Sequence, residues 1–206
     1  MRRRTARGTS GAIGGLVARN ILIRTALLLC CYSPAAAQVA GCVAIPDAAK
    51  ISEVGAFSNV RYTDEHAYGY LVMLWRAGDC LFGFFESSQG LAGDTPIGGL
   101  QDLKYDSKTG HLSFSAKLTT GVVSFRGSSG FEPSRDLFAF DGNLKGNTVT
   151  GVITYTLQNN PHSTSTHTNV VLGISKTEAD VMHGSTTHGE WLRKWQPILQ
   201  RLGPQW

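Results

Sequence analysis

Apolar and polar residues alternate along short segments of this chain, most regularly over residues 112–118. This segment reads Leu-Ser-Phe-Ser-Ala-Lys-Leu, so an extended strand here would have one apolar face and one polar face. Residues 105–110 precede it and are rich in turn formers, with Gly110 free to take a positive φ. The pattern predicts a half-buried strand that follows a tight hairpin connection.

The same pattern recurs along most of the chain. The expected strands are 54–62, 68–75, 81–86, 98–104, 112–118, 122–125, 137–140, 147–157 and 170–174. Most gaps between them are too short for a parallel crossover, so consecutive strands should pair as an antiparallel meander. The expected fold class is mainly β: an antiparallel up-and-down β-barrel of about eight strands, with a β-sandwich as the alternative.

Helical spacing replaces the alternation toward the C-terminus, over about 176–202. Residues 177–182 favour a short helix, and from Gly189 onward apolar residues recur at three- and four-residue intervals. These are Trp191, Trp195, Ile198, Leu199 and Leu202, with Arg193, Lys194 and Arg201 on the other side. We expect a C-terminal amphipathic helix that packs on the outside of the sheet through its two tryptophans. Pro197 should break or kink this helix near its middle.

The first 37 residues have the three parts of a secretory signal peptide. Arginines at positions 2, 3, 4, 7, 19 and 24 come before an apolar run at 26–31, and Ala35-Ala36-Ala37 provides the small residues of a cleavage site. We therefore expect an exported chain, periplasmic or secreted, whose single domain spans residues 38–206. The alternative is an uncleaved membrane anchor, because no charged residue occurs between Thr25 and Pro46.

Removal of this leader would change the charge of the chain. The full sequence has 19 Lys and Arg against 15 Asp and Glu, a net charge of +4. Without the six leader arginines the count is 13 against 15, a net charge of −2. A strongly basic chain would suggest nucleic acid as a partner. Since the basic character belongs to the leader, we expect no nucleic-acid partner.

Two cysteines, Cys42 and Cys80, remain after the expected cleavage. A single pair in an oxidising compartment predicts a disulfide between them. The competing prediction comes from Val39-Ala40-Gly41-Cys42, which matches a bacterial lipobox and would make Cys42 an acylated N-terminus. Membrane association is therefore expected only if Cys42 is lipidated or the leader is retained.

An exported β-meander of this size, with one disulfide and a helix after the last strand, resembles lipocalin-like and related calycin barrels in outline. The region 68–118, which contains Gly-Leu-Ala-Gly-Asp-Thr-Pro at 90–96, and the ending Gly203-Pro204-Gln205-Trp206 also resemble uncharacterised exported bacterial proteins. The lipocalin Gly-x-Trp signature near the first strand has no counterpart here, since the first tryptophan is Trp75. The resemblance implies an architecture and no binding residues.

Motifs that would fix a reaction are missing from the sequence. It contains no Walker A, G-x-G-x-x-G, H-E-x-x-H or G-x-S-x-G pattern, so we expect no catalytic residues and no cofactor. Histidines stand five residues apart at 162 and 167, and again at 183 and 188. That interval does not place two rings on one face of a helix and puts them on opposite faces of a strand, so no metal site is expected.

Glu86 is the acidic residue whose position most favours ligand binding. It follows Phe82 and Phe84 at every second position, so the three should share one face of a strand, and burial there would raise the pKa of Glu86. Aromatic residues on other strands would line an apolar pocket or fill a core. The candidate ligand-binding residues are Tyr70, Phe82, Phe84, Glu86 and Phe114.

These observations favour a non-catalytic exported β-barrel that binds a small, partly apolar ligand in the mouth of the barrel. One alternative is an envelope-associated interaction protein or lipoprotein without a cavity. Another is a hydrolase that uses the carboxylates of Glu86 and Asp94.

Overall fold

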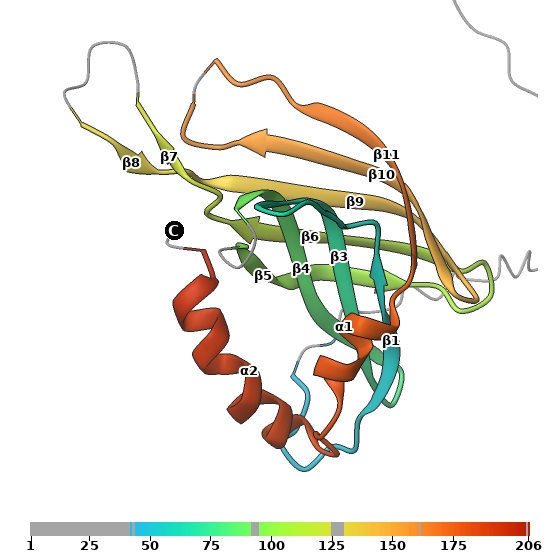
Figure 1. Ribbon diagram of the computed structural model, residues 1–206. Coiled ribbons are helices and arrows are strands. Elements are labelled where there is room, and N and C mark those ends of the chain that lie inside the picture. Colours follow the sequence, from blue (N-terminus) through green and yellow to red (C-terminus); the bar gives the residue numbers. More distant parts are fainter. Residues whose placement is uncertain (1–41, 43, 92–94, 125–129, 161, 205) are drawn as a thin grey trace, which may run out of the picture. The chain divides into compact units, whose positions relative to one another are not determined.

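Eight antiparallel strands close into a barrel in the computed structural model, which describes residues 42, 44–91, 95–124, 130–160, 162–204 and 206. The barrel strands are β1 (Ser52–Ser58), β3 (His66–Ala77), β4 (Cys80–Leu91), β5 (Ile97–Tyr105), β6 (His111–Leu118), β9 (Asp136–Lys145), β10 (Thr148–Leu157) and β11 (Thr166–Ile174). Neighbours in the chain are neighbours in the sheet, and β1 pairs with both β11 and β3, which closes the circle (Figure 1). The predicted up-and-down barrel is confirmed. The signal peptide expected at 1–37 lies outside the described residues.

Three short strands do not belong to this circle. β2 (Arg61–Tyr62) continues along β3 beyond the end of β1, and β7 (Val122–Val123) pairs with β8 (Glu132–Pro133) as a separate hairpin between β6 and β9. Of the strand expected at 122–125, Val122 and Val123 form β7 outside the barrel, and residue 125 lies outside the described residues. The strand expected at 137–140 is longer than predicted, because Gly142 does not turn the chain: it lies opposite Gly151, and together they leave space for the Phe140 ring.

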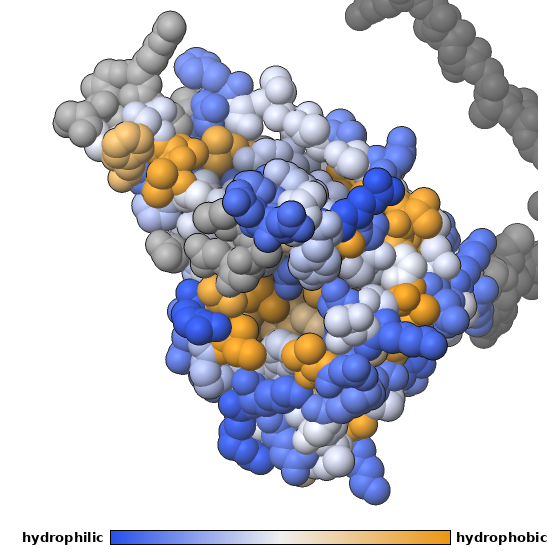
Figure 2. Space-filling view, in the orientation of Figure 1, coloured by the Kyte–Doolittle hydropathy of each residue, from blue (hydrophilic) through white to orange (hydrophobic). Residues whose placement is uncertain are grey.

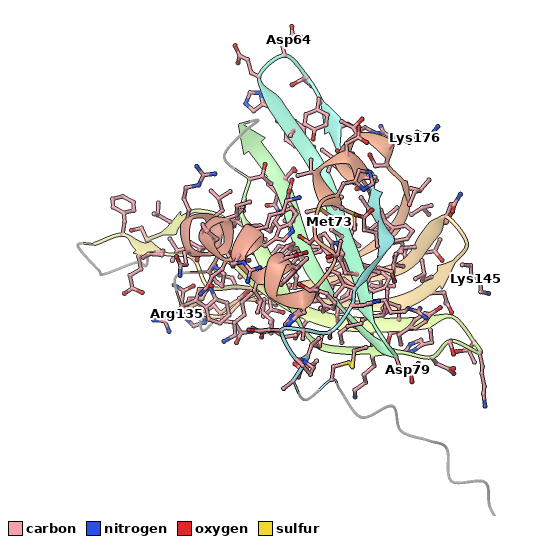
Figure 3. All side chains as sticks on the ribbon, turned by 90° about the horizontal axis from the view of Figure 1, so that it is seen from below. Asp64, Met73, Asp79, Arg135, Lys145 and Lys176 are labelled. Atoms are coloured by element: carbon pink, nitrogen blue, oxygen red, sulfur yellow. A yellow bond between two sulfur atoms is a disulfide. The ribbon has the colours of Figure 1, made fainter. Side chains whose placement is uncertain are left out.

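Two pairs of neighbouring strands are paired over only a few residues, and the sheet bends there. We call these two places the seams of the barrel. β4 pairs with β5 only over residues 84–86 and 97–99, and β1 pairs with β11 only over 57–58 and 173–174. At these seams the β3–β4 ribbon crosses the remaining strands at a steep angle (Figures 1 and 3). At one end of the barrel, β6 and β10 end and β9 begins, and Asp136 pairs there with Leu118 and Leu157. We call this end the rim.

Apolar side chains from all eight strands fill the interior of the barrel. The alternation predicted at 112–118 is observed, since every second residue of β6 is buried. Aromatic rings occupy the centre: Phe85 lies 5.2 Å from Phe138, and Phe114 lies 5.1 Å from Phe140, measured between ring centroids. This interior cluster contains sixteen buried residues, none more than 8% exposed.

Two helices cover the outer face of the β3–β4 ribbon. They are α1 (Lys176–Met182) and α2 (His188–Leu202), as the helical spacing predicts. Trp191 and Trp195 of α2 are buried, and each ring centroid lies 5.6 Å from that of Trp75 on β3. In Figure 3, Met73 on β3 lies between the two helices. The tryptophans therefore anchor α2, and they produce a second apolar cluster outside the barrel.

Pro197 does not end α2, which continues to Leu202. A proline inside a helix cannot donate to the carbonyl four residues earlier, here that of Arg193. Both residues lie on the exposed side of the helix, where water can bind that carbonyl oxygen instead. Within the described part of the chain, the helices are too short or too polar to cross a bilayer.

The predicted disulfide is present between Cys42 and Cys80, with the two Cα atoms 5.6 Å apart. It joins the segment before β1 to the first residue of β4, beside the Asp79 turn in Figure 3. The two cysteines are 38 positions apart in the sequence, and the bridge between them restricts the unfolded chain.

Candidate site at the barrel rim

The barrel wall separates the five candidate ligand-binding residues into two groups. Tyr70 and Phe114 face the interior and both pack against Phe85, at 5.7 and 6.0 Å between ring centroids. Phe82 and Phe84 face outward, toward α2. The ring of each lies 4.9 Å from that of Trp191. The two pairs do not meet, and their part in ligand binding stays a prediction.

Glu86 shares the outward face of Phe82 and Phe84, as the two-residue period predicts. It is partly buried, with buried Leu71 and Ile97 as its cross-strand neighbours. Burial is the main reason why the pKa of Glu86 is raised to about 7; the Glu178 carboxylate raises it further, and a hydrogen bond from Ser88 opposes the rise. Asp94, the second acid of the hydrolase alternative, lies outside the described residues.

A buried polar network, which sequence reasoning does not identify, lies at the rim. Its centre is Asp136, the first residue of β9, whose side chain is fully buried. Asp136 Oδ2 accepts hydrogen bonds from the backbone N–H of Thr120 at 2.8 Å, from Thr120 Oγ1 at 2.9 Å and from Ser134 Oγ. Asp136 Oδ1 accepts one from the Tyr155 hydroxyl at 2.9 Å. We call Thr120, Ser134, Asp136 and Tyr155 the rim network.

The rim network joins three separate parts of the chain: the segment after β6, the β8–β9 junction and β10. Ser134 Oγ also accepts from the backbone N–H groups of Thr120 and Gly121, at 3.0 and 3.1 Å. Burying a carboxylate is costly unless donors compensate its charge, and here four donor groups do so. Burial, followed by the hydrogen bond and charge of Asp136, raises the pKa of Tyr155 to about 12, so the phenol keeps the proton that it donates.

A cleft of about 290 Å³ lies beside the network, on the outside of the barrel. Its lining comes from Pro96 before β5, residues 119–122 after β6, Pro133 in β8 and residues 201–203 at the end of α2. Thr120 belongs to both the cleft and the rim network. We call this the rim cleft. Of the described residues that line it, Arg201 is the only charged one, and Pro96, Val122, Pro133 and Leu202 provide apolar surface.

The C-terminal end of the chain is held next to the rim cleft. Gly203 N–H donates to Leu199 O at 2.8 Å, and Trp206 Nε1 donates to Leu118 O, also at 2.8 Å. Lys117 Nζ lies 4.5 Å from the centre of the Trp206 ring, within range of a cation–π contact. These contacts fix the last turn of α2, and with it Arg201, against the strands that form the opposite wall.

The position of Asp136 in the alternating pattern of β9 is a sequence signal for the rim network. Asp136 has the same parity as Phe138 and Phe140, so the alternation places a carboxylate on the apolar face of β9. Acids are almost never fully buried without partners. The signal therefore predicts that donors surround Asp136, but their identities depend on the three-dimensional register.

Among the described residues, no three His, Cys, Asp or Glu side chains are grouped as possible metal ligands. Comparisons with protein-family models, with curated proteins and with solved structures found no match to this chain.

Proposed function

We propose that this protein is a non-catalytic binding protein that holds a small, partly apolar anion in the rim cleft. The observation that carries the proposal is the composition of the cleft: among the described residues that line it, Arg201 is the one cation and stands with apolar side chains and threonines. A guanidinium group binds carboxylates through paired charge-assisted hydrogen bonds. The apolar wall would take the remainder of the ligand.

The position of the cleft agrees with a ligand held at the mouth of the barrel. Side chains such as Phe85, Phe114 and Phe138 occupy the interior, so we expect the ligand outside it. The volume, about 290 Å³, is at the lower limit of typical ligand pockets. It corresponds to roughly ten water-sized groups. A short-chain carboxylate fits this size and the single positive charge.

We further propose that the protein acts after export, in the periplasm or outside the cell. The Cys42–Cys80 disulfide supports this proposal, because disulfides persist in oxidising compartments.

Isothermal titration calorimetry with the purified, oxidised protein tests the ligand class. Hexanoate is the probe, and hexanamide is its uncharged control. We expect heat of binding with hexanoate and a much weaker response with hexanamide. Arg201→Gln should weaken hexanoate binding by roughly ten-fold or more, because a charge-assisted hydrogen bond is lost.

Arg193→Gln is the matched control, since Arg193 is exposed on the same helix about two turns before Arg201 and does not line the cleft. It should leave hexanoate affinity unchanged. Equal affinity for the acid and the amide, or equal losses in the two arginine variants, would contradict an anion site at Arg201.

A second candidate function is an interaction protein, which the β7–β8 hairpin favours. Figure 1 shows this hairpin extending away from the barrel, and Figure 2 shows apolar side chains over it. Val122 is 68% exposed and Phe131 is 76% exposed. Exposed apolar groups on a projecting element are typical of contact surfaces. Phe131→Ser separates the two candidate functions. If the hairpin is an interface, this substitution should abolish self-association or partner binding. The affinity of the rim cleft for hexanoate should stay unchanged.

A further inference from the structure

One side of β11 is open along most of the strand. β10 pairs with β11 over almost its whole length, whereas β1 pairs with it only over residues 57–58 and 173–174. The chain then follows β3 instead, since the Asn59 N–H donates to Tyr70 O at 3.1 Å and β2 continues along β3. Over residues 166–172, none of the described strands pairs with the side of β11 that faces away from β10. We call this open side the β11 edge; in Figure 1 it lies along the upper margin of the sheet.

Every second residue of the β11 edge directs its backbone groups outward. The Ile174 N–H donates to Asn147 O beside β10, at 2.9 Å, and the Ser175 N–H donates to Ala56 O in β1, at 2.8 Å. Because successive residues of a strand direct their N–H and C=O groups to opposite sides, the odd-numbered residues face away from β10. The odd-numbered residues of the β11 edge are His167, Asn169 and Val171. In the described part of the chain, their N–H and C=O groups have no hydrogen-bond partner.

The β11 edge lacks the features that protect open strands in natural sheets. Such strands are usually very short, or they carry lysine, proline or a β-bulge. Residues 166–172 read Thr-His-Thr-Asn-Val-Val-Leu, without Asp, Glu, Lys, Arg or Pro, and their register with β10 is unbroken. Val171 is 64% exposed. The β11 edge is therefore open to pairing with another strand.

We propose that the β11 edge pairs with the same edge of a second copy of this chain, antiparallel and about a two-fold axis at Asn169. In this register Asn169 lies opposite its own copy, and His167 lies opposite Val171 of the second copy. Each hydrogen-bonded pair of an antiparallel ladder exchanges two bonds, so about six would form. On the inner face, Thr168 would lie opposite Val170. This pairing is independent of the ligand proposed for the rim cleft.

Symmetry is the reason for choosing a second copy as the occupant. A two-fold contact requires a surface that is complementary to itself. The outward residues 167, 169 and 171 are evenly spaced about Asn169, so an antiparallel copy meets every free N–H with a C=O and leaves none over. No like charges would lie opposite each other, because the segment has no acidic or strongly basic side chain. The His167 ring, 3.0 Å from Thr154 Oγ1, is held on the outer face, where it would cover Val171 of the second copy.

Sedimentation equilibrium of the purified, oxidised protein tests the association. We expect the mass of a dimer at about 100 μM, where a micromolar dissociation constant already gives mostly dimer. Val171→Lys places a charge on the β11 edge and should raise the dissociation constant by about ten-fold or more. Thr150→Lys is the matched control. Thr150 pairs with Val171, is exposed, and lies on β10, away from the open side, so this variant should stay dimeric.

Disulfide trapping tests the register. Directly opposite hydrogen-bonded residues have Cα atoms about 5.5 Å apart, which is within the range of a disulfide. Asn169→Cys should therefore form a bridge to its own copy, located by mass spectrometry of the linked peptides. Val171→Cys is the control on the same face. Its two copies would lie more than about 10 Å apart, so it should bridge to His167→Cys in an equimolar mixture but not to itself.

Three results would overturn the proposal, and they do not all depend on one variant. They are a monomeric protein at the concentration above, a dimer that Val171→Lys leaves unchanged, and self-bridging of Val171→Cys as readily as of Asn169→Cys. Trapping at residue 169 decides the register even if the lysine variant fails to fold. Phe131→Ser should leave the dimer intact, and its loss in that variant would assign self-association to the β7–β8 hairpin instead.

Discussion

The Tyr155 hydroxyl donates a hydrogen bond of 2.9 Å to Asp136 Oδ1, and this bond links the barrel interior to the rim cleft. The Tyr155 ring packs against Phe138 inside the barrel, at 5.1 Å between centroids. The other oxygen of Asp136 accepts from Thr120, which lines the cleft. A substitution at Tyr155 should therefore change both the free energy of unfolding and the shape of the rim cleft.

Tyr155→Phe removes one donor from a buried carboxylate and leaves the ring in place. We expect a loss of roughly 1.5–3 kcal/mol in the free energy of unfolding, the usual range for hydrogen bonds to charged groups. Urea denaturation measures this loss. Tyr68→Phe is the control, because Tyr68 is 51% exposed, and it should change the free energy of unfolding by less than about 0.5 kcal/mol. Equal effects of the two substitutions would show that the Tyr155–Asp136 bond contributes nothing measurable.

Asp136→Ala leaves the donors from Thr120, Ser134 and Tyr155 without their shared acceptor. We expect a loss of about 3 kcal/mol or more, because several buried donors become unsatisfied at once. Hexanoate affinity should also fall, although Asp136 does not line the cleft. Asp141→Ala on the same strand is the control, since the side chain of Asp141 is 78% exposed. Wild-type affinity in a folded Asp136→Ala protein would separate the network from the cleft.

Gly203→Ala tests whether the end of α2 positions the cleft. A Cβ atom at Gly203 would lie 2.1 Å from Leu199 O, so the last turn of the helix must shift. We expect weaker hexanoate binding in calorimetry together with a lower melting temperature. Gly121→Ala also adds a methyl group to the cleft lining, but its Cβ would meet no atom within 4 Å. The melting temperature should therefore fall in the first variant and stay unchanged in the second; the reverse order would contradict the close approach at Gly203.

Glu86 should make the protein less stable as the pH rises toward neutrality. Its pKa is raised from 4.5 to about 7 in the folded state, so the folded protein binds more protons than the unfolded chain between these values. The contribution of Glu86 to the free energy of unfolding is most favourable below about pH 4.5 and is lost by about pH 7. The change across this range is at most about 3 kcal/mol. Urea unfolding at about pH 5 and about pH 7.5 measures the difference.

Glu86→Gln should flatten this dependence. The pKa values of Asp106 and Glu190 are lowered by hydrogen bonds, so these two groups act in the opposite direction. Their contribution is lost only as the pH falls below the ordinary carboxyl range, which is below the window chosen here. A slope between about pH 5 and about pH 7.5 that persists in Glu86→Gln would assign it to other groups.

The alternation of residues predicts the barrel because it reports which side chains share a face. It works well on β6 and β9, where one face is buried and the other is more exposed. It also places Glu86 correctly beside Phe82 and Phe84. What it cannot decide is which face of β3 and β4 is the interior, because α2 buries the outer face as well and Leu71–Trp75 is buried without a break.

Local sequence patterns cannot predict the rim cleft, for a different reason. Its lining combines Pro96, Thr120 and Arg201, which lie far apart in the chain and come together through strand register and the docking of α2. By contrast, the Cys42–Cys80 bridge is predictable, since these are the two of the four cysteines that lie outside the expected leader.

The location of bound hexanoate is the most direct test of the proposal that the rim cleft, and not the barrel interior, is the ligand site. Backbone amide shifts in a ¹H–¹⁵N NMR titration report that location. We expect the largest changes at Thr120, Gly121 and Gly203, reduced in Arg201→Gln. Shifts concentrated at Phe85, Phe114 and Ile153 inside the barrel, with none at the cleft, would contradict the proposal.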